Sequence, residues 1–570
     1  MKTRELLLFG AAAFIVAACD SGDIRIEPTN VDNSAIDASV NPQCTNNCFS
    51  GSGGGGANDL CATYTQAGQT YQGIYDGTNC VYQTSFISNQ RHLLVDMTIP
   101  ALASGGAHIF YGSLFVGADY TTTAELQAAG IAQGGDGPTL TIQPGVTLAF
   151  ATKAQFMTIN RGSQLIAVGE PDNPITITSL SDVNGTISGP EAVQQWGGLV
   201  INGFGVTNKC SYTGTLGVDL AIIGDCAIDA EGSEGDDQSH YGGDNNADSS
   251  GHLEYVIVKH TGAEVANGDE LNGISWGGVG SGTTVKNIEV YSVYDDGMEF
   301  FGGAVNVENY LAVYARDDSI DIDEGYSGTI TNALVLQSAT DGNSCIESDG
   351  IGNYGGLTDV QIEAIIDQGI NSRPTINNLT CIISSNYPGT HDPGAGWRFR
   401  EGIFPTINDS MIIGSFSAND QTDPADNYCL RIDNRSQQAA LDGDLVLNRV
   451  IIACAERTHG QTLAGSAETE ESFAISQGVQ FATIPDGTAV NPTAAADAGL
   501  QLLEADVTGS PVYSIDWATS MVDGAQPIAS TDPTPDTYLG SLSLSAPDWT
   551  KPWAYGLDPA NRGETPWIEP

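Results

Sequence analysis

The feature that most restricts the fold of this chain is an internal repeat. Residues 285–300 match residues 307–322 position by position, each equivalent position lying 22 residues later. A third copy begins at Ile330, 23 residues after its counterpart, and weaker copies start at Pro374 and Pro405, 31 residues apart. A period of this length indicates a solenoid, in which each copy is one structural unit that stacks on its neighbours.

Short β-rich runs bounded by Gly, Asn or Asp recur through the chain, for example at 140–142, 165–168 and 253–258, without long amphipathic helices between them. A leucine-rich repeat would need its LxxLxLxxN signature, and a propeller would need a period near 40. We therefore predict an all-β, right-handed parallel β-helix whose coils stack about 4.8 Å apart. Equivalent asparagines then form an internal amide ladder: Asn287, Asn309 and Asn332.

The N-terminus predicts export. An apolar run at 6–18 follows Lys2 and Arg4, is too short to span a bilayer and is typical of a secretion signal. It ends in VAAC at 16–19, which resembles the bacterial lipobox; the resemblance implies that Cys19 is acylated and becomes the mature N-terminus, the alternative being a chance cysteine after an ordinary signal. We expect an extracytoplasmic, lipid-anchored protein, at the outer membrane or cell surface rather than the inner membrane.

The predicted organisation has five parts. They are a lipoprotein signal peptide (1–18), a flexible polar tether (19–60), a small cysteine-containing segment (61–89), the parallel β-helix (90–465) and a capping region (466–570) with a shielding role at the open end of the last coil. Apolar residues make up 41% of the chain, enough for a large core. With 70 acidic against 19 basic residues and a net charge of -51, nucleic acid is excluded as a partner.

The cysteine count agrees with an oxidising compartment. Of 11 cysteines, ten remain after Cys19, and the chain has no CxxC motif for redox or zinc chemistry. Neighbour pairing is the simplest prediction, although the first four cysteines admit other pairings. The predicted disulfides join Cys44 with Cys48, Cys61 with Cys80, Cys210 with Cys226, Cys345 with Cys381 and Cys429 with Cys454.

Stacking predicts which charged side chains become neighbours. In residues 320–325 the isoleucines alternate inward, which leaves Asp321 and Asp323 on the outer face, and residues 397–402 repeat this pattern with arginines. Two outer columns are expected. The first column contains Glu299, Asp321, Glu347, Arg398 and Arg431, and the second column contains Asp323, Asp349, Arg400 and Asp433.

The negative charges at the acidic ends of these columns need a compensating positive charge, because two carboxylates about 5 Å apart repel by about 3 kcal/mol at an effective dielectric constant of about 20. Calcium is the expected cofactor, since it accepts hard oxygen ligands in flexible geometry. Residues 244–248 add a second candidate with EF-hand-like spacing, although Ser249 and Tyr255 exclude a full EF-hand loop. The alternative is a solvated acidic face. The predicted calcium ligands are Asp244, Asn246, Asp248, Asp295, Asp296, Glu299, Asp317, Asp318, Asp321 and Asp323.

Four motifs carry a family resemblance: WGGLVI at 196–201, WGGVGSGTT at 276–284, DDGMEFFGG at 295–303 and DEGYSG at 323–328. They resemble a group of secreted or lipid-anchored bacterial parallel β-helix repeat proteins with the pectate-lyase-like superfamily fold, over roughly residues 90–340. The group brings no settled activity. Its members often neighbour TonB-dependent receptors, so the resemblance implies an outer-membrane receptor as a partner.

The same superfamily includes pectin-degrading enzymes. Asp296, Asp317 and Asp318 resemble the three catalytic aspartates of polygalacturonases, but ATDGN stands at 339–343 where that family has Gly-His-Gly. A pectate-lyase-like mechanism would need calcium and an unprotonated Arg398 or Arg400 as the base, and salt bridging is the alternative role of these arginines.

From these observations we expect a non-catalytic binding or interaction role at the cell envelope, with calcium stabilising the acidic coils. The alternative is a calcium-dependent lyase or hydrolase that acts on acidic polysaccharide.

Overall fold

The computed structural model describes residues 60–131, 135–232, 238–266, 269–383, 394–414, 428–454, 456–482, 514–516, 521–522, 526–527, 538–542 and 547–568. All of them belong to one compact unit, residues 56–570. The predicted signal peptide, Cys19 and nearly all of the tether lie outside the described residues, as do Cys44 and Cys48. No helix in the described ranges is long and apolar enough to cross a membrane.

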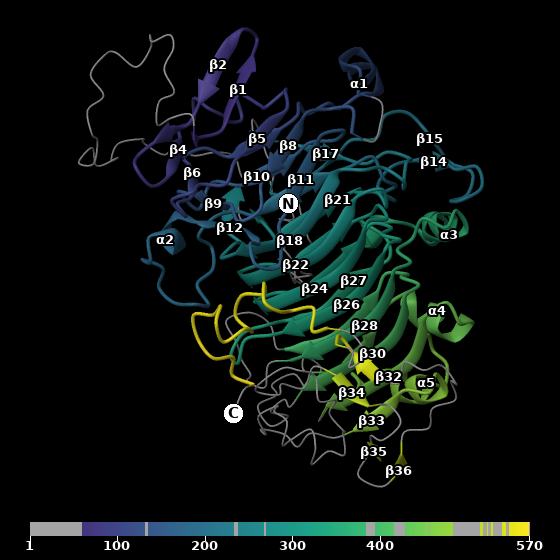
Figure 1. The fold of residues 1–570 in the computed structure, drawn as a ribbon. Helices are drawn as coiled ribbons and strands as arrows, with labels where there is room; N and C mark the ends of the chain where they lie inside the picture. The colour runs from purple at the N-terminus through teal and green to yellow at the C-terminus, as the bar shows by residue number, and fades with distance from the viewer. Residues whose placement is uncertain are drawn as a thin grey trace, which may run out of the picture. The chain divides into compact units, whose positions relative to one another are not determined.

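Two long sheets form the coils (Figure 1). The nine-stranded sheet is parallel and has the spatial order β31 (Leu430–Ile432), β29 (Ala395–Arg400), β27 (Ser344–Asp349), β25 (Ile320–Asp323), β23 (Met298–Phe301), β21 (Ile274–Gly277), β13 (Leu199–Asn202), β10 (Met157–Ile159) and β7 (Leu114–Val116). Because the neighbours in space come from successive coils, the predicted right-handed parallel β-helix is confirmed.

The sixteen-stranded sheet is parallel except for its first pair. Its path is β3 (Ile74–Tyr75), β4 (Cys80–Tyr82), β6 (His108–Phe110), β9 (Thr147–Phe150), β12 (Ile175–Ser179), β18 (Gly251–Lys259), β22 (Thr284–Val293), β24 (Asn306–Ala315), β26 (Thr329–Leu336), β28 (Thr375–Ile382), β30 (Thr406–Gly414), β32 (Val446–Cys454) and β33 (Gln480–Ala482). Beside it lie β5 (Met97–Ile99), β8 (Thr139–Ile142) and β11 (Gln164–Val168).

Short elements decorate the turns. The hairpins are β1 (Thr63–Gln66) with β2 (Gln69–Gln72), β14 (Tyr212–Thr213) with β15 (Ala221–Ile222), β16 (Ile228–Asp229) with β17 (His240–Tyr241), β19 (Glu264–Ala266) with β20 (Asp269–Glu270), β34 (Ser514–Asp516) with β37 (Tyr538–Gly540), and β35 (Met521–Val522) with β36 (Gln526–Pro527). The helices are α1 (Thr123–Ala129), α2 (Leu180–Val183), η3 (Tyr354–Gly356), α3 (Asp359–Asp367), α4 (Ser436–Asp442) and α5 (Glu470–Ser476).

The interior of the coils is filled by side chains that alternate inward. In β25 the burial alternates residue by residue, with Ile320 and Ile322 fully buried between partly exposed aspartates. Trp196, Trp276 and Trp397 are also fully buried in this core. Each fully buried large apolar side chain contributes about 2 kcal/mol, so the stack is stabilised along its whole length.

The predicted asparagine ladder is confirmed. Asn309 donates its amide to the Asn287 carbonyl (2.8 Å), and Asn332 donates to Asn309 (2.9 Å). All three have φ between 53° and 60°, a left-handed conformation that asparagine tolerates better than most residues. Their side-chain bonds therefore fix a sharp bend in each long strand.

A second asparagine ladder, which the repeat did not predict, runs through the later coils. The strand register pairs Asn377 with Thr331, so Asn378, with a φ of 57°, is the counterpart of Asn332. Asn377 instead belongs to a neighbouring ladder, in which Asn408 donates to Asn377 and Asn448 donates to Asn408 (2.9 and 2.8 Å). The two ladders therefore stand at adjacent strand positions.

Four of the predicted disulfides are confirmed, and their partners are Cys61–Cys80, Cys210–Cys226, Cys345–Cys381 and Cys429–Cys454. The fifth predicted disulfide, between Cys44 and Cys48, falls outside the described residues and stays a prediction.

Two of the four disulfides join the nine-stranded side of the coils to the sixteen-stranded sheet through the interior. Cys345 in β27 bonds Cys381 in β28, and Cys429, next to β31, bonds Cys454 in β32. All four of these cysteines are fully buried. The two bridges therefore act as internal cross-links of the later coils.

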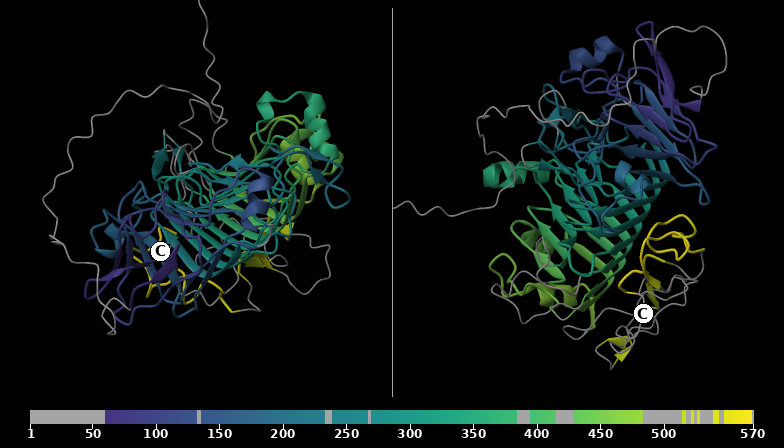
Figure 2. Two further views of the ribbon diagram at one scale, coloured as in Figure 1. Left: turned by 90° about the horizontal axis from the view of Figure 1, so that it is seen from above. Right: turned by 90° about the vertical axis from the view of Figure 1, so that its left-hand side faces the viewer.

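The C-terminal segment, residues 538–542 and 547–568, lies along the side of the coils (Figures 1 and 2). Its Trp553 and Leu557 pack on an outer apolar face that includes Leu311, Leu334 and Met411 of the sixteen-stranded sheet. This explains why the second halves of these strands are buried on both faces. Within the region for which a cap was predicted, β33 also continues the coil, pairing with β32.

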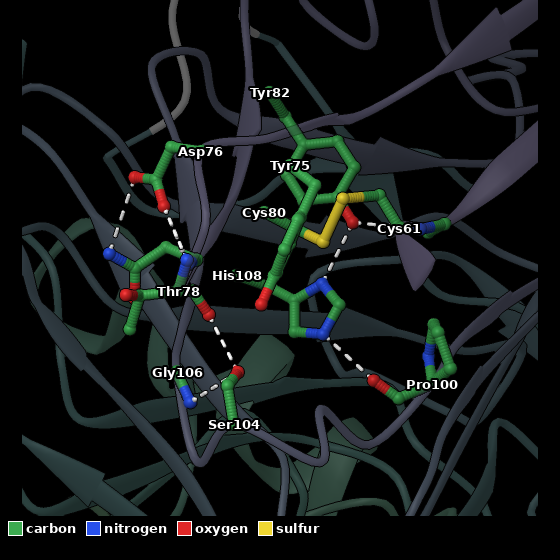
Figure 3. Close-up of a disulfide and its surroundings, with 12 residues drawn as sticks. Cys61, Tyr75, Asp76, Thr78, Cys80, Tyr82, Pro100, Ser104, Gly106 and His108 are labelled. Carbon is green, nitrogen blue, oxygen red and sulfur yellow. Dashed lines mark hydrogen bonds between the residues drawn. A yellow bond between two sulfur atoms is a disulfide. The ribbon is translucent and has the colours of Figure 1, made fainter. Parts of the chain in front are cut away.

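The first coil is closed by a buried hydrogen-bond chain beside the Cys61–Cys80 bridge (Figure 3). Ala62 N–H donates to the Tyr82 hydroxyl, which lies 2.8 Å from His108 Nδ1, and His108 Nε2 lies 2.8 Å from the Pro100 carbonyl. A carbonyl only accepts, so Nε2 carries the proton and Nδ1 accepts from Tyr82. A neutral imidazole fits this arrangement.

Acid is expected to weaken this coil through His108. Burial lowers the pKa of His108 to about 4 from 6.5, so below pH 6.5 the unfolded chain takes up a proton that the folded chain refuses. Stability is then lost between pH 6.5 and pH 4, by about 3 kcal/mol in total. We expect the difference in unfolding free energy between wild type and His108→Gln to shrink by this amount over that range, measured by chemical denaturation at each pH. A constant difference would contradict it.

Candidate functional site

The first predicted outer column is present on the nine-stranded sheet, together with one pair of the second column. The strand register pairs Glu299 with Asp321, Asp321 with Glu347, Glu347 with Arg398 and Arg398 with Arg431, which confirms the first column. In the second column Asp349 pairs with Arg400. Since parallel strands lie about 4.8 Å apart, these charged groups are unavoidable neighbours.

The first column continues toward the N-terminus with residues that an insertion covers. The register leads from Glu299 back through Ser275, Val200 and Thr158 to Phe115. Val200 and Phe115 pack against Tyr241 of the insertion, residues 203–250, which holds β14 to β17. The outer face of this sheet is therefore partly a covered surface rather than a solvated one.

The insertion is fastened at Glu324, which follows β25 and is fully buried. Glu324 accepts hydrogen bonds from the Tyr241 hydroxyl (2.7 Å) and the Thr207 hydroxyl (2.9 Å), and it forms an ion pair with Lys209. A buried carboxylate with a cation and two hydroxyl donors is satisfied. Glu324 thus holds the cover in place without needing a metal ion.

Next to the acidic part of the columns runs a ladder of short polar side chains at the coil corner. Asn272 Oδ1 accepts the backbone N–H of Asp296 (3.2 Å), Asp296 Oδ1 accepts that of Asp318 (2.9 Å), and Asp318 Oδ1 accepts that of Ser344 (2.5 Å). Asn272, Asp296 and Asp318 each stand two positions before a strand of the nine-stranded sheet. The ladder fixes one oxygen of each carboxyl group.

Burial decides between a solvated acidic face and a site that requires charge compensation. Asp296, Glu299 and Asp318 are only 7, 7 and 5% exposed. Water therefore contributes little to stabilising their charges.

The pKa shifts of five carboxyl groups in and beside the acidic part of the columns also indicate that their charges need compensation. Burial, followed by the charge of neighbouring carboxylates, raises the pKa of each of them well above its ordinary value: Asp296, Glu299, Asp318, Asp321 and Asp323. For Glu299 the largest neighbouring contribution is Glu231 of the insertion, and Asn272 donates to both carboxylates (2.6 and 3.0 Å). The cluster must hold protons or a cation.

Two groups of three carboxylates have ligand oxygens within 4.8 Å of one another. One contains Asp295, Asp296 and Asp317, and the other contains Asp296, Glu299 and Asp321, so Asp296 is common to both. Of the predicted calcium ligands, Asp318 and Asp323 lie beside these groups rather than in them. The role of all these residues as ligands stays a prediction.

The other predicted calcium loop has a visible structural role. Asn246 Oδ1 accepts the backbone N–H of Val206 (2.7 Å), and Asp248 Oδ2 accepts that of Phe204 (2.9 Å), so both side chains shape the insertion. Neither they nor Asp244 belong to the two groups of close carboxylates in the described chain. Calcium at this loop stays an untested prediction.

The arginine ends of the columns are paired. Arg398 lies 3.0 Å from Glu347 and 3.4 Å from Asp433, and Arg400 pairs with Glu347 and Asp349. Although burial opposes the charged form, these carboxylates raise the pKa of Arg400 above its already high ordinary value. The later coils are therefore neutralised from within the protein, whereas Asp296 and Glu299 form no ion pair with an arginine in the part of the chain that the structure describes.

Asn272 and Glu231 were missed by the sequence analysis. A signal for Asn272 was present, because NGI at 272–274 aligns with DGM at 296–298 and DSI at 318–320. Glu231 lies in the insertion, outside any repeat, so nothing in the sequence places it near Glu299.

The coils, their inward core and the charged outer columns together define a parallel β-helix protein. A family model described as pectate-lyase-like beta helix domain matches residues 117–493, and the chain belongs to this family. The predicted family resemblance is confirmed at this level. None of the curated proteins and none of the solved structures compared with the chain matches it.

Proposed function

We propose that this protein is a lipid-anchored, extracytoplasmic β-helix with a non-catalytic binding or interaction role at the cell envelope, in which calcium holds the acidic part of the outer columns. The observation that carries the proposal is the pair of close carboxylate groups that share the buried Asp296. Calcium suits them because they offer several hard oxygens in an irregular arrangement. The four disulfides support an oxidising compartment outside the cytoplasm.

The proposed partners are an outer-membrane receptor of the TonB-dependent class or a polysaccharide. The net charge of -51 favours partners that present cationic or neutral surfaces and disfavours nucleic acid. Membrane attachment would come from lipid on Cys19, since acyl chains anchor a protein without a spanning helix.

The alternative is a lyase or hydrolase on acidic polysaccharide. A lyase would need Arg398 or Arg400 to lose its proton, and both are paired with carboxylates that favour the protonated form. For a hydrolase, Asp296, Asp317 and Asp318 do gather at one corner, and the raised pKa of Asp296 would suit a general acid. Incubation with polygalacturonate, with and without calcium, separates the proposals. Unsaturated product that Arg398→Ala abolishes would establish the lyase, and new reducing ends that Asp296→Asn abolishes would establish the hydrolase.

Calcium is expected to raise the melting temperature of the protein, and EDTA is expected to lower it. The effect should grow as the pH rises, because the raised pKa values mean that protons replace the cation in acid. In Glu299→Gln/Asp321→Asn two carboxylates become neutral, so the variant in EDTA should melt above wild type in EDTA and should respond little to calcium.

The matched control is Glu308→Gln. Glu308 lies on the sixteen-stranded sheet, has a side chain 51% exposed, and pairs with Lys286. This variant should keep the full calcium response. Identical melting of the wild-type protein in calcium and in EDTA at pH 8 would leave the acidic cluster protonated and refute the calcium site.

A further inference from the structure

A polar depression of about 480 Å³ lies on the outside of the first coils, on the sixteen-stranded sheet and not on the sheet of the charged columns. Its walls come from five separate parts of the chain. The lining residues are Thr78, Asn79, Gly105, Gly106, Ala107, Thr147, Thr176, Thr178, Asp182, Val183, Asn184 and Lys259. Its volume lies in the range of ordinary small-molecule sites.

The depression contains one ion pair and is otherwise uncharged. Lys259 Nζ lies 2.8 Å from Asp182 Oδ2, and the Thr178 hydroxyl donates to the same carboxylate (2.7 Å). Lys259 is only 8% exposed, and its ammonium lies 4.1 Å from the centre of the Tyr555 ring in the C-terminal segment. The two charges cancel, so the lining favours neither an anion nor a cation.

The outward positions of this sheet change character along the stack. In the later coils they are apolar, for example Leu311 and Leu334, and the C-terminal segment covers them. In the first coils the equivalent positions are Thr147 and Thr176, which are partly exposed and stand in register with each other. Within the described chain their hydroxyls have no hydrogen-bond partner. Covered apolar surface thus gives way to an open surface of hydroxyl groups.

The rim on the first coil is held rigidly (Figure 3). Asp76 accepts the backbone N–H groups of Thr78 and Asn79 (2.9 and 2.8 Å), and the Ser104 hydroxyl donates to the Thr78 carbonyl (2.8 Å). Cys80, the residue after Asn79, forms a disulfide bond with Cys61. A preformed rim loses little conformational entropy when a ligand binds.

We propose that this depression binds a neutral saccharide unit. Its hydroxyl and amide groups both donate and accept hydrogen bonds, as sugar hydroxyls do. Adjacent sugar hydroxyls also match the ion pair, one donating to Asp182 and the other accepting from Lys259. The near absence of large apolar side chains from the lining disfavours a lipid or an aromatic ligand. The proposal rests on the proposed function, which includes a polysaccharide as a partner, and it places that ligand at a site that uses no residue of the acidic cluster.

Saturation-transfer NMR with glucose, galactose and galacturonate tests the proposal on the intact protein. We expect transfer to glucose or galactose, and weaker binding by Thr147→Val/Thr176→Val of about thirtyfold, since the variant loses two hydrogen bonds worth about 1 kcal/mol each. Valine keeps the shape and the strand preference of threonine, so the coil should fold.

The matched control is Thr406→Val, which changes a partly exposed threonine at the start of β30, outside the depression. It should bind as wild type does, and so should wild type in EDTA, which separates this site from the calcium proposal. The proposal is overturned if neither neutral sugar shows transfer, if the double variant binds like the control, or if galacturonate binds more tightly than galactose.

Discussion

Replacing Cys345 and Cys381 together by alanine is expected to lower the free energy of unfolding by about 4 kcal/mol, because the bridge closes a loop of 36 residues in the unfolded chain. The expected loss of stability is large for a single site, because this disulfide joins the two sheets through the interior of the coils. Trp397 also loses a contact, because its indole Nε1 lies 3.3 Å from Cys381 Sγ. Chemical denaturation under non-reducing conditions, followed by circular dichroism, measures the effect.

The control for this experiment is Cys210→Ala/Cys226→Ala. That bridge closes a shorter loop of 16 residues and lies in the insertion, away from the coil interior. We expect its loss to loosen the insertion and to leave most of the coil transition in place. If the variant without Cys345 and Cys381 unfolds at the same denaturant concentration as wild type, the bridge does not stabilise the coils.

The repeat predicted the coils and the outer columns because both depend on relationships one period apart. Once 22-residue copies stack in parallel, the alternation in Ile320-Asp321-Ile322 decides which side chains face outward, and the alignment decides their neighbours. The columns therefore followed from local sequence alone. The same reasoning placed the asparagine ladder at Asn287, Asn309 and Asn332.

The burial of the columns was not predictable in this way. The contacts that cover them join residues far apart, such as Thr207 with Glu324 across 117 positions. Neither residue belongs to a motif that marks the other, because the insertion is not part of the periodic pattern. The sequence therefore predicted the acidic groups but not whether water or protein surrounds them. Because Asp296 and Glu299 are buried, they form a candidate cation site and not a solvated acidic face.

The return of the C-terminal segment along the sixteen-stranded sheet also depends on contacts between distant residues, which the repeat does not predict. The backbone N–H of Tyr555 donates to Glu289 (2.7 Å) across 266 positions. The repeat aligns Glu289 with Leu311, which hinted that this outward position is apolar in other coils. Only the covering segment explains why a carboxyl group there is fully buried.

Replacing Glu289 by glutamine is expected to stabilise the protein at neutral pH. Burial raises the pKa of Glu289 well above its ordinary 4.5, and the hydrogen bond from Tyr555 and the charge of Lys259 oppose the rise only in part. Its Oε1 has no hydrogen-bond partner among the described residues. The folded protein therefore holds a protonated carboxyl group at a pH where the unfolded chain has already released the proton.

The stability gained by Glu289→Gln should grow as the pH rises. Below pH 4.5 both states are protonated and the wild-type carboxyl group causes no loss of stability. Above it, the wild-type protein loses about 1.4 kcal/mol for each pH unit, until the folded carboxyl group ionises. Glutamine has the same shape and no charge at any pH, so the stability of the variant relative to wild type should rise at this slope from about pH 5 upward.

Chemical denaturation of wild type and Glu289→Gln at a series of pH values measures this difference directly. The exposed Glu308→Gln control should give no such slope, since water reaches its carboxyl group in the folded and the unfolded state. Parallel curves for wild type and Glu289→Gln would mean that the carboxyl group ionises in place, and the C-terminal segment would then have to admit water beside Tyr555. A rising difference would show that this segment keeps Glu289 dry, because burial is the cause that raises the pKa of this carboxyl group.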